Sequence, residues 1–297
     1  MQHRIKAQWR QLPDSGKGVA LALCSTLGFV LVGVLVRMLS ERFEPFQILF
    51  FRQLVFVAVL LPAISRNLAE LLKPKRVSMH LARIVGAFVA FYFSFISVSN
   101  LPLADATALG FTQVLFVAVI AKLWLSEDLS RSRLFSLGFG FLGVMMVVQP
   151  NFSAGELHFI GAGLLAAMGA AVAVIVVRAL AQSQSKLMLL TYQAVAVGLI
   201  ALVPSLHQWQ WPTPPELTLL LLVGGISSVA QWLGVSAYQW AAANVVANVE
   251  YVKILYALAL GILLFAERPN LLAVAGAAVL IASAVIPLWL SHQRRQQ

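Results

Sequence analysis

Long apolar runs recur along the whole chain, and each is close to the roughly 20 residues that a helix needs to cross the hydrocarbon of a bilayer. Ten such runs lie between turn signals, at residues 18–38, 46–64, 78–99, 104–125, 133–149, 157–179, 187–206, 217–240, 244–265 and 270–290. The composition agrees, because 60% of the residues are hydrophobic, 11% are charged and the mean hydropathy is +0.87. The sequence therefore predicts an all-α polytopic membrane protein with ten transmembrane helices.

Basic residues, which give the chain a net charge of +10, indicate the orientation of these helices. If the N-terminus is cytoplasmic, the cytoplasmic segments hold Arg4, Lys6, Arg10, Lys17, Arg66, Lys73, Lys75, Arg76, Arg131, Arg133, Arg178, Lys186, Arg294 and Arg295. The opposite side holds only Arg37, Arg42 and Arg268. Under the positive-inside rule, we expect both termini in the cytoplasm. Because the cations lie at helix ends without interleaved aromatic residues, we do not expect nucleic-acid binding.

Metal and nucleotide chemistry have no support in the sequence. The chain has one cysteine, Cys24, so no disulfide can form within it, and its five histidines show no metal-ligand spacing. The nucleotide-binding pattern G-x-x-x-x-G-K-[ST] does not occur. We therefore expect no catalytic residues, no metal and no cofactor.

The two halves of the chain are similar in sequence. An offset of 140 residues aligns Leu123–Asp128 (LWLSED) with Leu263–Arg268 (LLFAER) and matches their glutamates. The same offset pairs Phe111 with Tyr251. The sequence thus predicts an internal duplication.

A second alignment extends this duplication to the first helix of each half. Near an offset of 141, Leu27–Leu39 parallels Met168–Leu180. Two five-helix repeats follow, residues 1–152 and 153–297, and because five is odd the second must be inverted in the membrane. Inverted repeats are a recurring plan of alternating-access transporters, with the substrate site near mid-membrane at the repeat interface. The expected fold is two inverted five-helix repeats around a central cavity.

The repeated pattern of Ser97–Asp128 (SVSNLPLADATALGFTQVLFVAVIAKLWLSED) and Ser236–Arg268 (SAYQWAAANVVANVEYVKILYALALGILLFAER) resembles the EamA-type members of the drug/metabolite transporter superfamily. The resemblance covers nearly the whole chain, and bacterial aromatic amino acid exporters are the most similar members. It implies a basket in which the third, fourth, eighth and ninth helices line a cavity, while the fifth and tenth pack peripherally. The family often has a proline in the middle of the fourth and ninth helices, near Val114 and Ile254 here.

The resemblance implies a secondary transporter in a bacterial inner membrane that exports small metabolites, above all amino acids, aromatic or otherwise neutral. Export of drugs or nucleotide-type metabolites is the alternative, and a membrane enzyme acting on lipid-linked substrates is a more distant one. Either the substrate gradient or a coupled ion such as H⁺ drives transport, and Glu250 is the carboxylate we assign to H⁺ coupling. Small residues in the fifth and tenth predicted helices suit contacts within a monomer or across a homodimer.

Glu250 and Lys253 place opposite charges inside the predicted ninth helix, where each charge costs about 2.5–3.5 kcal/mol on insertion scales. Lys253 lies about 14 Å along that helix, near mid-membrane, and residues three apart share a helix face. Two roles fit. The pair can be self-neutralising and purely structural, or Lys253 can attract a substrate carboxylate while Glu250 attracts an ammonium group or changes protonation.

Other candidates lie on the helices that the resemblance places around the cavity. Gln113, the offset-140 counterpart of Lys253, can bind a ligand or a neighbouring helix. The further candidates for substrate binding are aromatic or amide side chains on the third and eighth helices, namely Tyr92, Gln231, Trp232 and Tyr238. They suit a flat or aromatic solute, although such stripes also serve packing alone.

Two arginines need separate treatment. Arg52, within Phe50–Gln53 (FFRQ), can contact substrate, but we favour a structural or gating role. Arg83 lies close to a predicted cytoplasmic helix end, so we expect it to snorkel to the interface without a function.

Overall fold

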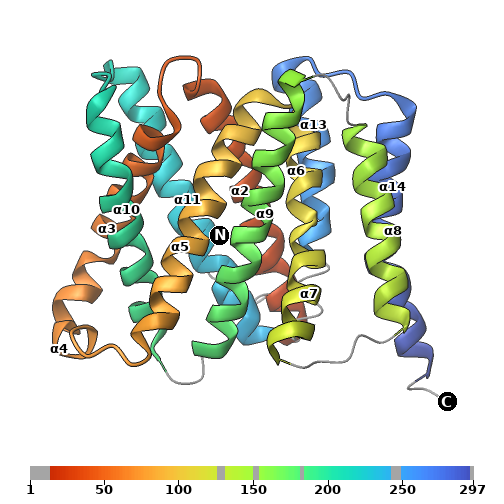
Figure 1. Cartoon of the computed structure of the whole chain (residues 1–297), viewed down its shortest axis with the longest axis horizontal. Helices are drawn as coiled ribbons and strands as arrows, with labels where there is room; N and C mark the ends of the chain where they lie inside the picture. The colour runs from red at the N-terminus through yellow and green to blue at the C-terminus, as the bar shows by residue number, and fades with distance from the viewer. Residues whose placement is uncertain (1–13, 126–130, 150–153, 181–183, 242–248, 295–297) are drawn as a thin grey trace, which may run out of the picture.

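The computed structural model describes residues 14–125, 131–149, 154–180, 184–241 and 249–294. This part of the chain is helical and contains no strand. Its helices form an elongated bundle (Figure 1). They are α2 (Asp14–Leu39), α3 (Pro45–Arg66), α4 (Leu68–Leu71), α5 (Val77–Asn100), α6 (Leu103–Phe111), α7 (Gln113–Leu125), α8 (Arg131–Val148), α9 (Ala154–Leu180), α10 (Lys186–His207), α11 (Pro214–Trp240), η1 (Glu250–Val252), α13 (Lys253–Phe265) and α14 (Leu271–Arg294).

Seven of the described helical segments are long and apolar enough to cross a bilayer, with mean hydropathies of 1.7–2.6. Two shorter apolar segments, Leu137–Val148 in α8 and Leu271–Ser283 in α14, accompany them. The chain is therefore a polytopic, all-helical membrane protein, as the apolar runs predict. Ten crossings remain a prediction.

The predicted helix 104–125 is divided into α6 and α7, although Leu103–Ile120 is one of the seven apolar spans, and residues 244–248 of the predicted helix 244–265 lie outside the described residues. α6 ends at Phe111 and α7 begins at Gln113, with Thr112 between them donating both its N–H (3.0 Å) and its hydroxyl (2.6 Å) to the carbonyl of Leu109. A 3₁₀ turn, η1, likewise precedes α13. Thr112 and Val252 are 140 residues apart, so the two interruptions are equivalent under the sequence repeat. Neither involves proline, and short 3₁₀ stretches inside helices often mark hinges.

The most extensive helix contacts are α5 with α9, α2 with α11, α8 with α14, and α3 with α10. Under the predicted repeat, α2, α3, α5 and α8 correspond to α9, α10, α11 and α14. The α5–α9 contact is then equivalent to the α11–α2 contact, and the other two contacts each join a pair of equivalent helices. This is the pattern that two repeats related by a two-fold axis produce. α8 and α14 lie together at one side of the bundle (Figure 1).

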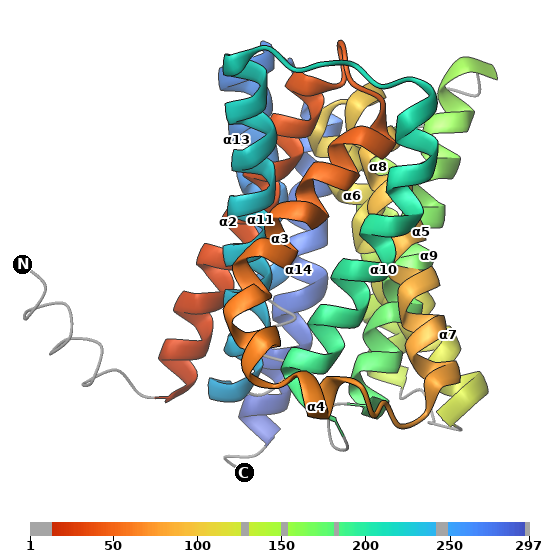
Figure 2. The same cartoon turned by 90° about the vertical axis from the view of Figure 1, so that its left-hand side faces the viewer.

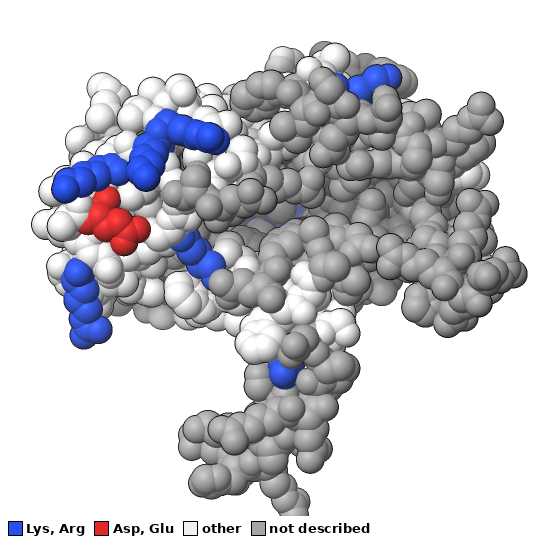
Figure 3. Space-filling model, turned by 90° about the horizontal axis from the view of Figure 1, so that it is seen from below, with Lys and Arg blue, Asp and Glu red and all other residues white. Residues whose placement is uncertain are grey.

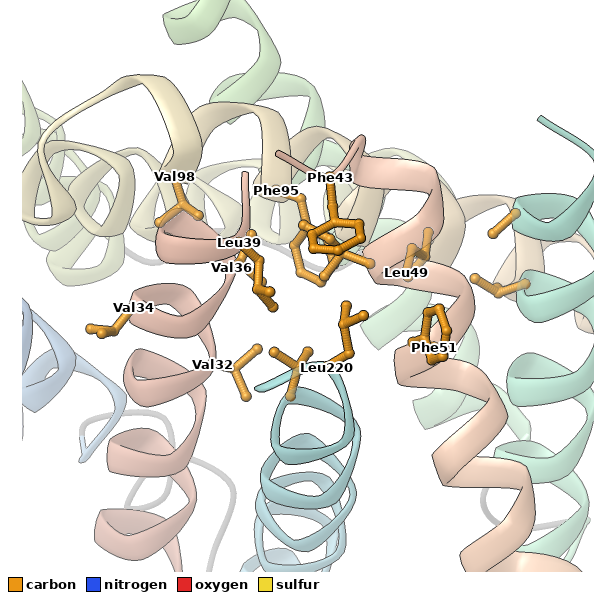
Figure 4. Close-up of a cluster of buried hydrophobic side chains, with 14 of the residues drawn as sticks. Val32, Val34, Val36, Leu39, Phe43, Leu49, Phe51, Phe95, Val98 and Leu220 are labelled. Atoms are coloured by element: carbon orange, nitrogen blue, oxygen red, sulfur yellow. The ribbon is translucent and has the colours of Figure 1, made fainter. Parts of the chain in front are cut away.

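We call the end with the α2–α3, α10–α11 and α13–α14 connections the distal end, and the end with α4 the proximal end (Figure 2). The main apolar core lies toward the distal end and joins α2, α3, α5 and α11. In Figure 4, Val36 and Leu39 of α2 point toward Leu49 of α3 and Leu220 of α11. This core holds helices of both sequence halves together at one end.

The two ends differ in charge. At the proximal end, the segment joining α3 to α5 exposes Arg66, Lys73, Lys75 and Arg76, and basic side chains dominate the described surface there (Figure 3). The described cations at the distal end are Arg37, Arg42 and Arg268. The asymmetry agrees with the predicted orientation, in which the proximal end is cytoplasmic.

Candidate functional site

Lys253 and Glu250 pair with each other at the interruption before α13. Lys253 Nζ donates to Glu250 Oε2, and the side chains are 23% and 38% exposed, respectively. The ammonium also lies 5.6 Å from the ring centroid of Phe29, in the middle of α2. Because α13 runs twelve further residues to Phe265, the pair lies about 18 Å below the distal end of that helix. A partly accessible cation and carboxylate therefore lie on a 3₁₀–α junction, far below the distal end of α13.

The equivalent interruption in the first half lies directly beside this pair. Phe111 and Tyr251, which are matched by the offset of 140, stack on each other with centroids 5.0 Å apart and an interplanar angle of 8°. Gln113, the counterpart of Lys253, begins α7, is half-buried and makes no hydrogen bond to the described residues. A small pocket beside the stack is lined by apolar residues and Thr112. The structure therefore brings the two repeats together at these junctions.

Arg52 is buried between three helices, with 2% of its surface exposed. Its guanidinium carbon lies 3.8 Å from the ring centroid of Phe91 on α5, and its Nη2 is 3.4 Å from Oε1 of Gln231 on α11. Its Nη1 has no hydrogen-bond partner among the described residues. The structure thus joins two sequence candidates, Arg52 and Gln231, across 179 residues of sequence.

The aromatic candidates divide into different environments. Tyr92 on α5 stacks with Phe46 of α3 at 4.2 Å between centroids and with Phe88 at 5.7 Å. Trp232 is 54% exposed and faces Lys186, whose Nζ lies 5.4 Å from its ring centroid. The side chain of Tyr238 lies outside the described residues. Tyr92 therefore belongs to an aromatic wall, whereas Trp232 lies near the proximal end, away from it.

Sequence reasoning missed Arg83. The residue does not snorkel, because only 5% of its surface is exposed. Its Nη2 donates to Oε1 of Gln193 on α10, at 2.9 Å. The sequence held one signal for this contact, because Gln193, the partner of Arg83, is matched by Gln53 at the offset of 140 residues. The structure buries both glutamines, on the packed helices α3 and α10.

A second missed residue, Glu267, links three helices at the distal end. Its carboxylate forms an ion pair with Arg37 at the end of α2, and its Oε1 accepts a hydrogen bond from the backbone N–H of Leu103, at the start of α6 (2.9 Å). The Arg37 guanidinium also lies over the ring of Phe265, 4.3 Å from its centroid. Glu267 thus ties helices of the first sequence half to the end of α13.

Further polar contacts close the same end. Arg42 donates to both carboxylate oxygens of Glu216 at 2.7 and 2.8 Å. Gln47 exchanges two hydrogen bonds with the backbone of Gln210, at 2.6 and 3.1 Å. The proximal end also has a bond between the sequence halves, because the hydroxyl of Tyr192 donates to the carbonyl of Leu71 at 2.6 Å. Side-chain bonds therefore join the two sequence halves at both ends of the described structure.

Comparisons with known proteins point to one kind of protein. Residues 16–149 match the EamA-like transporter family. Pseudopaline exporter CntI of Pseudomonas aeruginosa is 27% identical, covering 90% of this chain and 94% of that protein. S-adenosylmethionine uptake transporter of Rickettsia bellii is 24% identical, covering 92% of this chain and 93% of that protein. An uncharacterized transporter of Helicobacter pylori is 25% identical, covering 91% and 93%.

A solved structure described as "Crystal structure of protein" has a TM-score of 0.65 and 15% sequence identity, and covers 91% of this chain and 98% of that one. At this identity it supports the fold alone.

Proposed function

We propose that this chain, of which residues 16–149 match the EamA-like transporter family, is a secondary transporter that exports small amino-acid-like metabolites from a bacterial cell. It works by alternating access between two inverted repeats, residues 1–152 and 153–297. The packing pairs that interchange or map onto themselves support this arrangement. So does the stack of Phe111 on Tyr251, because equivalent residues touch each other only near a two-fold axis.

The observation that carries the proposal is the Glu250–Lys253 pair at mid-depth. A zwitterionic amino acid carries one carboxylate and one ammonium group, so it can exchange partners with a pair of opposite charges at little net electrostatic cost. Both side chains are partly exposed and therefore open to such an exchange. Their place at a helix interruption is where transporters commonly bind their solutes.

The aromatic wall supports a solute with a flat or apolar body. Phe46, Phe88 and Tyr92 form stacked contacts between α3 and α5, and Phe29 lies beneath the Lys253 ammonium. Apolar walls with a few polar groups are the usual construction of small-molecule sites. The name of the Rickettsia bellii relative describes a solute that contains methionine and an adenosyl group. A nucleotide-type solute is therefore the second candidate.

The direction of transport and the orientation of the chain in the membrane are part of the same proposal. One relative is named as an exporter and another as an uptake transporter, so export rests on the resemblance. With both termini cytoplasmic, the distal end faces outward and the proximal end faces the cytoplasm.

Counterflow in liposomes tests the proposal. Purified protein is reconstituted in vesicles preloaded with unlabelled Phe, Trp, Tyr, Thr, Met or S-adenosylmethionine, and entry of the same labelled solute is measured. We expect saturable entry that an internal load accelerates for at least one amino acid, with protein-free vesicles as the control. Entry that is linear in concentration and indifferent to the load would indicate a channel, and no entry of any of these solutes would contradict the proposal.

A further inference from the structure

Buried polar atoms without a hydrogen-bond partner among the described residues recur on three helices that pack against one another. They belong to Arg52, Gln53, His80, Arg83, Ser97, Thr191, Gln193 and Trp209. All of these residues lie on α3, α5 and α10 or directly after α10. Buried polar groups in native proteins are normally paired, so a concentration of unpaired ones marks a place that receives water or a ligand.

Arg83 is the charged centre of this region. Its only described hydrogen bond goes to the uncharged amide of Gln193, and its Nε and Nη1 have no partner among the described residues. None of the described aspartates or glutamates forms an ion pair with it. The Gln193 amide nitrogen is also unpaired within the described chain. Within the described part of the chain, the cluster thus presents N–H donors and a full positive charge without an anion to receive them.

Arg52 has surroundings similar to those of Arg83, at a different depth in the bundle. It too is buried, contacts a glutamine amide and leaves one guanidinium nitrogen unpaired among the described residues. Its contact on α5, Phe91, lies eight residues beyond Arg83, which corresponds to about 12 Å along the helix. Two buried cations therefore lie at successive depths from the proximal end.

An uncompensated charge in a low-dielectric interior is expensive, and the cost falls when an anion with matching hydrogen-bond geometry arrives. Guanidinium groups match carboxylates especially well, because two N–H donors can bind two oxygens. We propose that Arg83 and Gln193 form a binding station for the carboxylate of the transported solute, and that Arg52 with Gln231 forms the next station toward the distal end. This inference rests on the proposed function and assigns its solute an anionic group.

A purely structural Arg83 predicts something different. If the residue only fastens α5 to α10, its removal destabilises the protein and leaves anion binding unchanged. If Arg83 instead binds the solute carboxylate, its charge is unpaired in the ligand-free protein. Replacing Arg83 with a neutral side chain then removes the cost of burying an unpaired charge. The ligand-free protein then loses little stability but no longer responds to carboxylates.

Thermal unfolding of the full chain in detergent separates the two roles. The probes are sodium benzoate, its neutral isostere benzamide, and sodium phosphate, at constant ionic strength. For the wild type we expect benzoate to raise the unfolding temperature in a saturable way, with little effect of benzamide. In Arg83→Gln we expect an apparent Kd for benzoate higher by about tenfold or more, the value of a lost charge-assisted hydrogen bond.

The matched control is Arg66→Gln, which removes an exposed arginine at the end of α3 and should keep the wild-type response. If Arg83→Gln does not fold, Arg83→Lys keeps the cation but loses the planar fork, and we expect it to bind benzoate with a higher Kd than the wild type. An unchanged benzoate response in Arg83→Gln, or in the wild type a stronger response to phosphate or benzamide, would overturn the inference. So would normal counterflow of a transported amino acid by Arg83→Gln, while wild-type counterflow would still uphold the transport function.

Discussion

At the scale of single residues, the pair of Lys253 and Glu250 can be probed one charge at a time. We expect Lys253→Met and Glu250→Gln each to lower the counterflow rate of a transported amino acid by about tenfold or more, because each removes one charge-assisted contact to the solute. The unfolding free energy should change by only about 1 kcal/mol, since the pair is partly exposed. Gel filtration and thermal unfolding check that the variants fold.

The double variant distinguishes binding from self-neutralisation. If the pair serves only to cancel its own charges, Lys253→Met combined with Glu250→Gln restores transport, because no unpaired charge is left. If both groups bind solute, the double variant is at least as defective as either single one. Full transport by both folded single variants would show that the pair has no part in binding.

Glu267 gives a second prediction at this scale. Glu267→Ala leaves the Arg37 guanidinium and the Leu103 N–H without their shared acceptor, whereas Glu267→Gln keeps an oxygen for the N–H. With side chains 25% and 13% exposed, the Arg37–Glu267 pair is largely buried. We expect Glu267→Ala to cost about 2–3 kcal/mol of unfolding free energy and Glu267→Gln about half as much, by chemical denaturation. Equal stability of the two variants would exclude the bond to α6 as a significant contribution.

At the scale of helices, close packing of α5 on α9 depends on two glycines. A Cβ on Gly169 would lie 2.7 Å from the carbonyl oxygen of Gly86 and 2.8 Å from the backbone nitrogen of Ala90. We therefore expect Gly169→Ala to lower the unfolding temperature, because backbone atoms cannot move aside as a side-chain end can. In the same helix, a Cβ on Gly161 would meet no neighbouring atom of the described chain within 4 Å, so Gly161→Ala should leave stability unchanged or raise it. A similar loss in both variants would contradict the packing explanation, because helix propensity favours alanine over glycine at both positions.

The helices themselves were readable from the sequence, but their interruptions were not. Hydropathy reports which residues avoid water, and the helices on both sides of Thr112 are apolar. The interruption there depends on the 3₁₀ bonds of Thr112 to Leu109, which leave no mark on the apolar pattern. The repeat offset carries the missing signal, since Thr112 and Val252 occupy equivalent places.

The candidate site was predictable only where its parts are close in the chain. Glu250 and Lys253 are three residues apart, so helical spacing was enough to predict their contact. Arg52 and Gln231 are joined only by tertiary packing, and nothing local in either segment indicates the partner. Arg83 was misjudged because its distance from a helix end was measured along the chain, whereas α10 covers it in space.

At the scale of the whole molecule, side-chain bonds join the two sequence halves at both ends. The ion pairs Arg37–Glu267 and Arg42–Glu216 lie at the distal end, and Tyr192 donates to the Leu71 carbonyl at the proximal end. Under the proposed alternating access, the bonds at one end break when that end opens, so their strength contributes to the balance between the two states. A transporter that cycles in this way cannot make either closure as strong as a structural core.

Inversion of the two repeats makes a prediction about the exposed starts of their first helices. Ser15 at the start of α2 and Glu156 near the start of α9 are 141 residues apart, the offset that aligns these helices, and both side chains are exposed. Single cysteines at these positions, in a Cys24→Ser background, can be labelled with a membrane-impermeant maleimide in intact spheroplasts. Because the positive-inside rule places the proximal end in the cytoplasm, we expect Glu156→Cys to react at once and Ser15→Cys only after permeabilisation. The reverse result would invert the assigned direction of the structure, and reaction of both from one side would exclude inverted repeats, which require equivalent positions to face opposite compartments.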